Sequence, residues 1–329
     1  MNPIASLVLG ASLAVATLVP QHVFAAQSYP SKPVRIINPY PAAGAGDVLA
    51  RALAAEMGKT LGQTVFVENR TGAAGNVGAE VVARAEPDGY TILLSPLSLY
   101  VVGPVLYSKL NYDPLKDLTP IIALASSGFV LVVHPSLPVR SVKELVALAK
   151  SRPGKMSYAS VGNGSMVHLQ GEMFKQMAGV DILHVPYRGG PAAITDLLSG
   201  QVEMTFDNVP TAVPFIKAGK LRALGVTGGK REVALPDVPT VSEAGVTGYE
   251  AVTWHALAAP ANTPREMITT LNAAAVQGLS SPALVKRLAD LSFQIIGGSP
   301  EQMAKLIEDS VRRWNPVVKA VKASGVKID

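Results

Sequence analysis

Short β-branched runs alternate with longer amphipathic runs along this chain, and this alternation constrains the fold more than any other feature. In a first series, strand-like runs at 34–38, 65–67 and 90–94 alternate with helix-like runs at 48–57 and 77–85. In a second series, strand-like runs at 129–133, 156–159, 182–185, 204–206 and 223–226 alternate with helix-like runs at 143–150, 166–177 and 192–198. A last strand is expected at 251–257, before a helical C-terminal stretch. The alternation predicts βαβ units and mostly parallel sheets.

The junction between the two series carries no Pro/Ser-rich linker, internal repeat or low-complexity tract, and the series run together through residues 125–128. Because tandem domains usually have an exposed linker, this favours two lobes connected by crossing strands. We predict an α/β protein in which residues 26–126 and 247–329 form one lobe and residues 127–246 form the other. Clefts between such lobes commonly bind small ligands.

Composition excludes several classes of function. The 329 residues are 48% hydrophobic and 16% charged, as in a folded protein with a sizeable core. The chain has no cysteine, which removes disulfides, thiolate nucleophiles and thiolate metal ligands together. A net charge of +5 with only 5% aromatic residues gives no basic, aromatic stripe of the kind that binds nucleic acid. No nucleic-acid partner is expected.

The first 25 residues have the pattern of a secretory signal peptide. An uncharged apolar run covers residues 4–19, and Val23 and Ala25 occupy the −3 and −1 positions for cleavage after Ala25. The run is short for a membrane span. A cleaved signal places the mature protein in the periplasm. Because no Lys or Arg precedes the run, an uncleaved anchor is the alternative, and the intact mass of the expressed protein distinguishes the two.

Three loops share one layout, in which a strand is followed by small residues and then by a helix. They span residues 38–47, 159–165 and 185–191. Ligands of open α/β sheets bind at the carboxyl ends of strands, and the helix N-terminus behind each loop offers unpaired N–H donors. Several such loops can hold a carboxylate without an arginine. Glycine also serves turn geometry alone, so each loop by itself has two interpretations, and Asp47 is either an N-cap or a ligand-contacting group.

Known catalytic and phosphate-binding motifs do not fit this sequence. After Gly162 and Gly164, Val167 stands where a dinucleotide fingerprint needs its third small residue. No Gly-x-Ser-x-Gly elbow surrounds Ser165, and no histidine pair has zincin spacing. His168 is expected to form a structural hydrogen bond behind the second loop. We therefore predict no catalytic residue, no metal site and no cofactor.

A series of stretches along the mature chain matches one known family in sequence and in order. The stretches are 29–35, 39–51, 67–76, 87–91, 158–169, 184–189, 196–202, 206–208, 235–240 and 243–245. The chain resembles the Bug-type solute receptors, the periplasmic substrate-binding components of tripartite tricarboxylate transporters. The resemblance implies a type II periplasmic-binding-protein fold, with a ligand cleft between two α/β lobes joined by crossing strands. It also implies a monomer that binds a small carboxylate, delivers it to the membrane permease subunits and catalyses no reaction.

The family holds a ligand carboxylate through backbone amides, hydroxyls and ordered waters from both lobes. Carried over to this sequence, the resemblance implies first-lobe contacts from Tyr40, Ala42, Ala43, Gly44 and Asp47. It implies second-lobe contacts from Ser160, Gly162, Ser165, Tyr187 and Asp207. Closure of the lobes would exclude bulk water and strengthen these hydrogen bonds.

Two departures from the family pattern bear on specificity. Ala43 replaces the first of two paired glycines, and its methyl group narrows the floor of the site. Segment 95–100 is more apolar than the family's usual one, although it offers Ser95 and Ser98 as further candidate contacts. We hypothesise that the distal part of the ligand is aromatic or apolar. A calorimetric titration in which citrate binds far more tightly than any aromatic carboxylate would contradict this hypothesis.

Some alternatives stay open at the level of sequence. The same closing cleft serves a ligand-sensing receptor with a signalling partner, and a receptor deletion that leaves uptake intact would favour that function. A secreted enzyme acting on a small acid is a second alternative, which recovery of the unchanged ligand after incubation would exclude. Trp254 is either a core residue or part of the cleft wall. The identity of the carboxylate depends on side-chain directions that one sequence does not fix.

Overall fold

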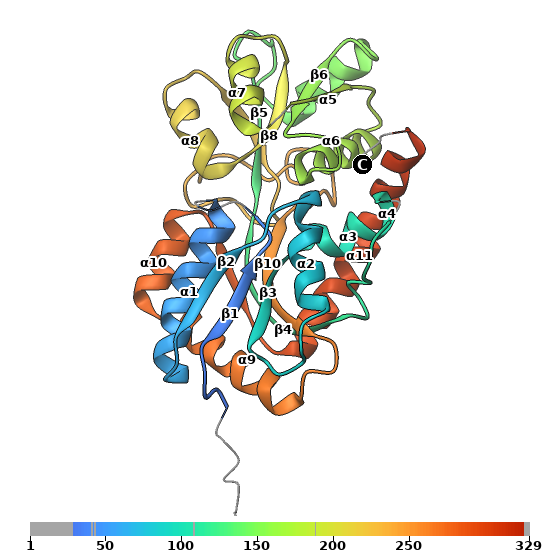
Figure 1. The fold of residues 1–329 in the computed structure, drawn as a ribbon. Coiled ribbons are helices and arrows are strands. Elements are labelled where there is room, and N and C mark those ends of the chain that lie inside the picture. The colour runs from blue at the N-terminus through green and yellow to red at the C-terminus, as the bar shows by residue number, and fades with distance from the viewer. Residues whose placement is uncertain (1–28, 41, 43, 108, 188, 326–329) are drawn as a thin grey trace, which may run out of the picture.

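The structure, a computed structural model, describes residues 29–40, 42, 44–107, 109–187 and 189–325. The predicted signal peptide, residues 1–25, and the predicted contact Ala43 lie outside the described residues. The chain folds into two α/β lobes, each built on its own sheet (Figure 1). Among the described residues, no helix combines the length and the apolar character that a membrane crossing requires.

The first lobe contains a six-stranded sheet in the order β11-β4-β10-β3-β1-β2. Its strands are β1 (Val34–Asn38), β2 (Val65–Asn69), β3 (Thr91–Pro96), β4 (Leu118–Ser127), β10 (Thr253–Pro260) and β11 (Gln294–Gly297). Its helices are α1 (Ala45–Leu61), α2 (Asn76–Ala83), α3 (Leu97–Val101), α4 (Gly103–Leu106), α9 (Arg265–Leu279), α10 (Pro282–Asp290) and α11 (Pro300–Ala323), with a 3-10 turn, η1 (Ala73–Gly75), before α2.

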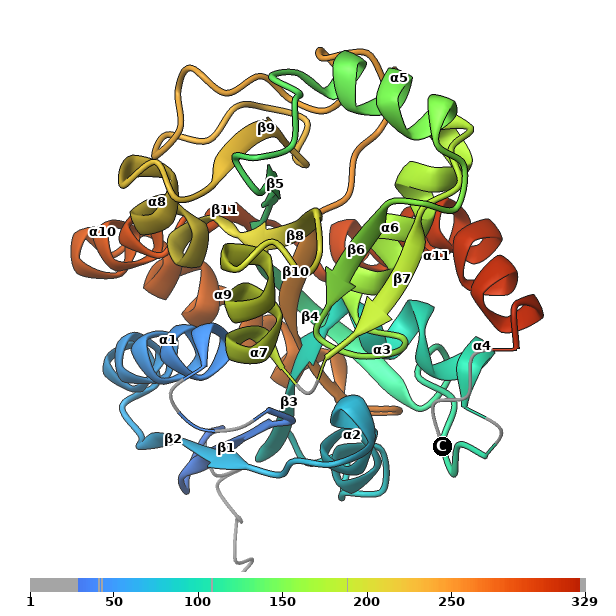
Figure 2. The same ribbon diagram turned by 90° about the horizontal axis from the view of Figure 1, so that it is seen from above.

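The second lobe contains a five-stranded sheet in the order β7-β6-β8-β5-β9. Its strands are β5 (Phe129–Val133), β6 (Ser157–Ser160), β7 (Leu183–Pro186), β8 (Met204–Asn208) and β9 (Arg222–Val226). Its helices are α5 (Val142–Ser151), α6 (Met166–Ala178), α7 (Gly190–Leu198) and α8 (Val209–Lys217). Figure 1 places α7 at the top of the second lobe, and in the view from above it projects between α1 and α2 of the first lobe (Figure 2).

Strand direction corrects one expectation from the sequence, because both sheets are mixed rather than mostly parallel. Strands β1, β2 and β3 pair in parallel, as do β6, β7 and β8. Strand β10 runs antiparallel to β3 and β4, and β5 runs antiparallel to β8 and β9. The antiparallel strands flank the two places where the chain crosses between lobes, β4 to β5 and β9 to β10 (Figure 1). A crossing chain enters a sheet from the other lobe and not through a βαβ connection, so it need not be parallel to its neighbours.

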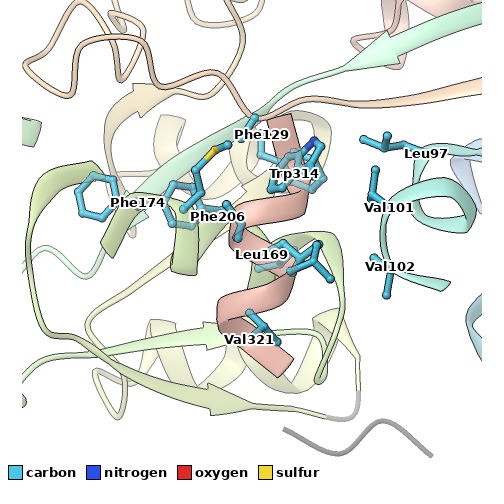
Figure 3. Packing of buried hydrophobic residues seen from close by; sticks show 14 of the residues in the cluster. Leu97, Val101, Val102, Phe129, Leu169, Phe174, Phe206, Trp314 and Val321 are labelled. Atoms are coloured by element: carbon cyan, nitrogen blue, oxygen red, sulfur yellow. The ribbon is translucent and has the colours of Figure 1, made fainter. Parts of the chain in front are cut away.

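One apolar cluster continues from the first lobe into the second. Side chains of α3, α6 and α11 and of strands β5 and β8 lie together in it (Figure 3). Trp254 belongs to this cluster and is only 2% exposed, and its indole N–H donates to Ser310 Oγ of α11 at 3.1 Å. Trp254 is therefore a core residue, which resolves the choice left open by the sequence. Two further clusters lie within single lobes, one against α1 and α9 and one against α7 and α8.

Candidate functional site

A cavity of about 500 Å³ lies between the lobes, and both lobes line it. Of the twelve residues expected at the site, four line this cavity: Tyr40, Gly44, Ser98 and Ser165. Several other lining residues were not predicted from the sequence, and the polar ones among them are Asn76, Tyr107, Ser127, Asn163, Asn208, Thr253 and His255. Among the described residues of the lining, none is an Asp, Glu, Lys or Arg. Within this described lining, the groups that can balance a charge on a ligand are dipoles and neutral hydrogen-bonding groups.

The first loop leads from β1 into the N-terminus of α1, which opens on the cavity. Gly44 is the N-cap, with extended backbone and no side-chain cap. Gly44 and Gly46 both line the cavity, so the backbone of the first turn of a 17-residue helix meets it at these two glycines. The first N–H groups of a helix have no intrahelical partner, and the helix dipole places partial positive charge there. This turn can accept an anion.

Asp47 serves the scaffold of that loop. It is the third residue of α1 and not its N-cap, which corrects one of the two interpretations left open. Its carboxylate is buried and accepts hydrogen bonds from Asn38 Nδ2 at 3.1 Å, Asn69 Nδ2 at 2.8 Å and Arg51 Nε at 2.9 Å. Asp47 does not line the cavity. It joins the end of β1, the end of β2 and the first turns of α1.

Tyr40 connects this scaffold to the cavity wall. Its N–H donates to Asn38 Oδ1 at 3.2 Å, and its carbonyl accepts from Asn69 Nδ2 at 2.9 Å. Its hydroxyl lies 2.9 Å from Ser98 Oγ, so two predicted contacts form one hydroxyl pair in the wall. Burial raises the pKa of the Tyr40 phenol, which therefore stays a neutral hydrogen-bonding group. Ala42, also predicted, is exposed and does not line the cavity.

The second loop is held by its own side chains. Ser165 is the N-cap of α6: its Oγ accepts from the His168 N–H at 3.2 Å and donates to the Gly162 carbonyl at 2.7 Å. Ser160 Oγ donates to the same carbonyl at 3.1 Å and accepts from the Gly162 N–H at 3.1 Å. Gly162 and Gly164 have φ of +127° and +71°, values that favour glycine. The predicted serine hydroxyls thus shape the loop, while Val161, Asn163 and Gly164 join Ser165 in lining the cavity.

Two stacked histidines support the second loop from behind. His168 Nδ1 accepts from the Gly164 N–H at 3.1 Å, which confirms the structural role expected for it. His184 stacks on His168 with ring centroids 3.8 Å apart, and its Nε2 lies 2.6 Å from Ser160 Oγ. Burial lowers the pKa of each imidazole to about 4. Both rings are therefore neutral at pH 7.

The third loop and β8 contribute predicted residues that lie outside the cavity lining. Tyr187 donates its N–H to the Ser160 carbonyl at 3.0 Å and its hydroxyl to Asp196 at 2.8 Å. Asp207 Oδ1 accepts from the Asn208 N–H at 2.9 Å, but Oδ2 is buried without a hydrogen-bond partner among the described residues. Burial raises the pKa of the Asp207 carboxyl to about 6. Its neighbour Asn208 lines the cavity.

Segment 95–100 is apolar for a reason other than the ligand. Ser95 is buried and donates to the Tyr100 hydroxyl at 2.8 Å, while Leu97 and Leu99 are core residues. Only Ser98 of this segment reaches the cavity. The apolar residues of this segment, which led to the hypothesis of an apolar ligand, therefore pack in the core and do not line the cavity. The cavity does have an apolar wall, but other residues form it: Val102, Phe129, Val161, Met166, Val167 and Phe293.

Known proteins resemble this chain in family, in sequence and in structure. The family described as "Tripartite tricarboxylate transporter family receptor" matches residues 49–323. The protein BugT of Bordetella pertussis is 37% identical over 299 residues, which cover 91% of this chain and 92% of BugT.

Solved structures of similar proteins include two that carry dicarboxylates. The structure described as "R. palustris Rpa4515 with adipate" has a TM-score of 0.77 and 37% sequence identity, and the match covers 89% of this chain and 98% of that one. MatC of Rhodopseudomonas palustris, solved with bound malate, has a TM-score of 0.74 and 33% identity, with 88% and 100% covered. Both matches span the two lobes described above.

Proposed function

We propose that this chain, which belongs to the tripartite tricarboxylate transporter family of receptors, captures a small carboxylate in the cavity between its lobes. It is a solute-binding receptor of the type II periplasmic-binding-protein fold. The related proteins solved with adipate and malate support a carboxylate as the class of ligand. The observation that carries the proposal is the uncapped N-terminus of α1, which opens on a cavity without a charged side chain among its described lining residues.

The energetics of this arrangement suit an anion. A helix N-terminus contributes up to about 2 kcal/mol to an anion in a partly buried site. Hydrogen bonds to a charged group contribute about 1.5–3 kcal/mol each. The first turn of α1 and the second loop together provide several such donors. Tyr40, Gly44, Ser98 and Ser165 are proposed to contact the ligand, whereas Asp47, Ser160 and Tyr187 hold the loops in place.

We also propose where the receptor works in the cell and with which partners. The receptor is exported by a signal peptide, residues 1–25, and works in the periplasm as a monomer. Residues 26–126 with 247–329 and residues 127–246 close on the ligand as two lobes, a division that follows the two sheets. The closed receptor passes its ligand unchanged to the membrane permease subunits.

A thermal-shift screen tests the proposal. The panel is acetate, malate, adipate, citrate, benzoate and phenylacetate, with the matching primary amides as controls. At a hundredfold excess over its dissociation constant, a bound carboxylate should add about 2.7 kcal/mol of stability. Recovery of the ligand unchanged after incubation supports a receptor. A flat response to all the acids would contradict the proposal.

A further inference from the structure

One histidine in the cavity wall has no partner that explains it. His255 lies on β10, in register with Pro96 of β3 and Ala125 of β4, and is 9% exposed. Its Nδ1 is buried without a hydrogen-bond partner among the described residues. A buried polar atom without a partner costs stability, so such atoms need an explanation.

The other ring nitrogen of His255, Nε2, lies next to the first turn of α1. The ring forms a T-shaped contact with Phe293, with ring centroids 5.7 Å apart. Nε2 lies 3.1 Å from the point where a side chain on Gly46 would place its Cβ. Both His255 and Gly46 line the cavity. Nε2 therefore lies beside the first turn of α1, where its N–H groups meet the cavity.

The protonation state of the ring follows from these surroundings. Burial lowers the pKa of His255 to about 4, so the ring is neutral at pH 7 and carries one proton. A buried N–H without an acceptor is rarer in proteins than an acceptor without a donor. The proton is therefore better placed on Nε2, at the cavity, than on the enclosed Nδ1. In that tautomer His255 offers a neutral N–H donor beside the α1 N-terminus.

We infer that His255 donates its Nε2–H to a carboxylate oxygen of the ligand bound at the first turn of α1. The inference rests on the proposed function and adds a residue to it. Backbone N–H groups of α1 approach the carboxylate from one side, and the imidazole approaches it from β10. Gly46 belongs to the same arrangement, since any side chain there would press on the imidazole. A ligand group without an acceptor oxygen at this place would leave both sets of donors unpaired.

Three substitutions at one position separate a ligand contact from a structural role. His255→Leu removes both nitrogens, His255→Gln carries an amide nitrogen close to the place of Nε2, and His255→Asn carries one only as far as Nδ1. His134→Gln is the matched control, because His134 pairs with Ser136 in the second lobe and does not line the cavity. The probe is the panel acid that binds the unmodified protein most tightly, among acetate, malate, adipate, citrate, benzoate and phenylacetate.

Calorimetric titration should show at least a tenfold weaker affinity for His255→Leu and His255→Asn. His255→Gln should recover part of the loss, and His134→Gln should bind as the unmodified protein does. The melting temperature of ligand-free His255→Leu should be equal or higher, because the substitution removes an unpartnered buried nitrogen. Lower affinity with undiminished stability is a result that a purely structural histidine would not give.

Three outcomes distinguish a failure of the role inferred for His255 from a failure of the proposed function on which it rests. If the unmodified protein binds a panel acid and His255→Leu binds it equally well, the role of His255 is wrong and the carboxylate receptor stands. If His255→Leu loses affinity only in proportion to a lower ligand-free melting temperature, the inference is also overturned. If the unmodified protein binds no acid at all, the proposed function itself fails.

Discussion

Each lobe has an aspartate next to the cavity, and the two carboxylates differ in their burial and hydrogen bonding: Asp47 is buried, whereas Asp207 is half-buried. Asp47 of the first lobe accepts hydrogen bonds from Asn38, Asn69 and Arg51. Asp207 of the second lobe accepts one from the Asn208 N–H, and its Oδ2 is buried without a partner among the described residues. Both were expected to contact the ligand, and neither lines the cavity.

The difference shows what each lobe contributes. The first lobe holds its loop with a satisfied charge network, so the N-terminus of α1 stays open and fixed. The second lobe holds its loop with neutral serines and two stacked, neutral histidines. Asp207 is half-buried, with one enclosed and unpartnered oxygen among the described residues and a raised pKa, a state that costs stability at neutral pH. Ionisable groups with unsatisfied hydrogen bonds and shifted pKa values are concentrated at functional sites, where function is retained at the expense of stability.

The largest effect is expected at Asp47. Asp47→Ala removes the common acceptor of two amides and a guanidinium, and should lower the free energy of unfolding by about 3 kcal/mol. Asp47→Asn keeps the shape and should cost less. Urea denaturation measures both values. If the Asp47→Ala protein is as stable as the unmodified one, the scaffold role assigned to this residue is wrong.

Acidification should destabilise the protein through three histidines with lowered pKa values. His168 and His184, together with His255, have folded-state pKa values lowered to about 4. The unfolded chain, with ordinary histidines, binds more protons between pH 6.5 and 4, so stability is full above pH 6.5 and falls as the pH drops through this window. The raised pKa of Asp207, about 6, acts in the opposite direction and offsets part of the loss.

The net loss between pH 7 and pH 5 should be about 2 kcal/mol, after allowance for the partial exposure of His184. Urea denaturation at a series of pH values gives the curve. A stability that is constant or rises over this range would contradict neutral, buried histidines behind the second loop.

The smallest effect is expected at Asp207. Asp207→Asn removes a half-buried carboxylate that is ionised at pH 7, and should raise the free energy of unfolding there by about 1 kcal/mol. The advantage should shrink as the pH falls below 6, where the native carboxyl is protonated, so the variant's stability should fall more steeply with acid. A loss of stability at pH 7 would show that the carboxylate has a partner in solution.

The sequence was sufficient to predict the fold class and the positions of the loops. Alternating periodicity predicted most of the parallel strands and the helices between them, and the residues of the three loops carried the family resemblance. Strands β4 and β11 were missed. Strand β4 is ten residues long, contains Pro120 and has no regular alternation of buried and half-buried positions, so no period of two revealed it.

The directions of the side chains at the site could not be predicted from the sequence. Ser160 and Tyr187 are in predicted loops, but their polar groups bond within the lobe, because an uncharged loop must satisfy its own buried carbonyls and N–H groups. His255 was missed because β10 is buried on both faces, so alternation could not show which side chain meets the cavity. A histidine in such an apolar run is the one signal that could have indicated it.

The proposed carboxylate receptor is tested most directly by calorimetric titration of the mature protein. The ligands are the panel acid that binds most tightly and, in parallel, the primary amide of that acid. We expect one site per chain for the acid and at least a hundredfold weaker binding of the amide, a difference of about 2.7 kcal/mol. Such a difference is expected where backbone donors and the α1 dipole meet a full negative charge. Equal affinity for acid and amide, or binding of neither, would contradict a receptor built around a carboxylate.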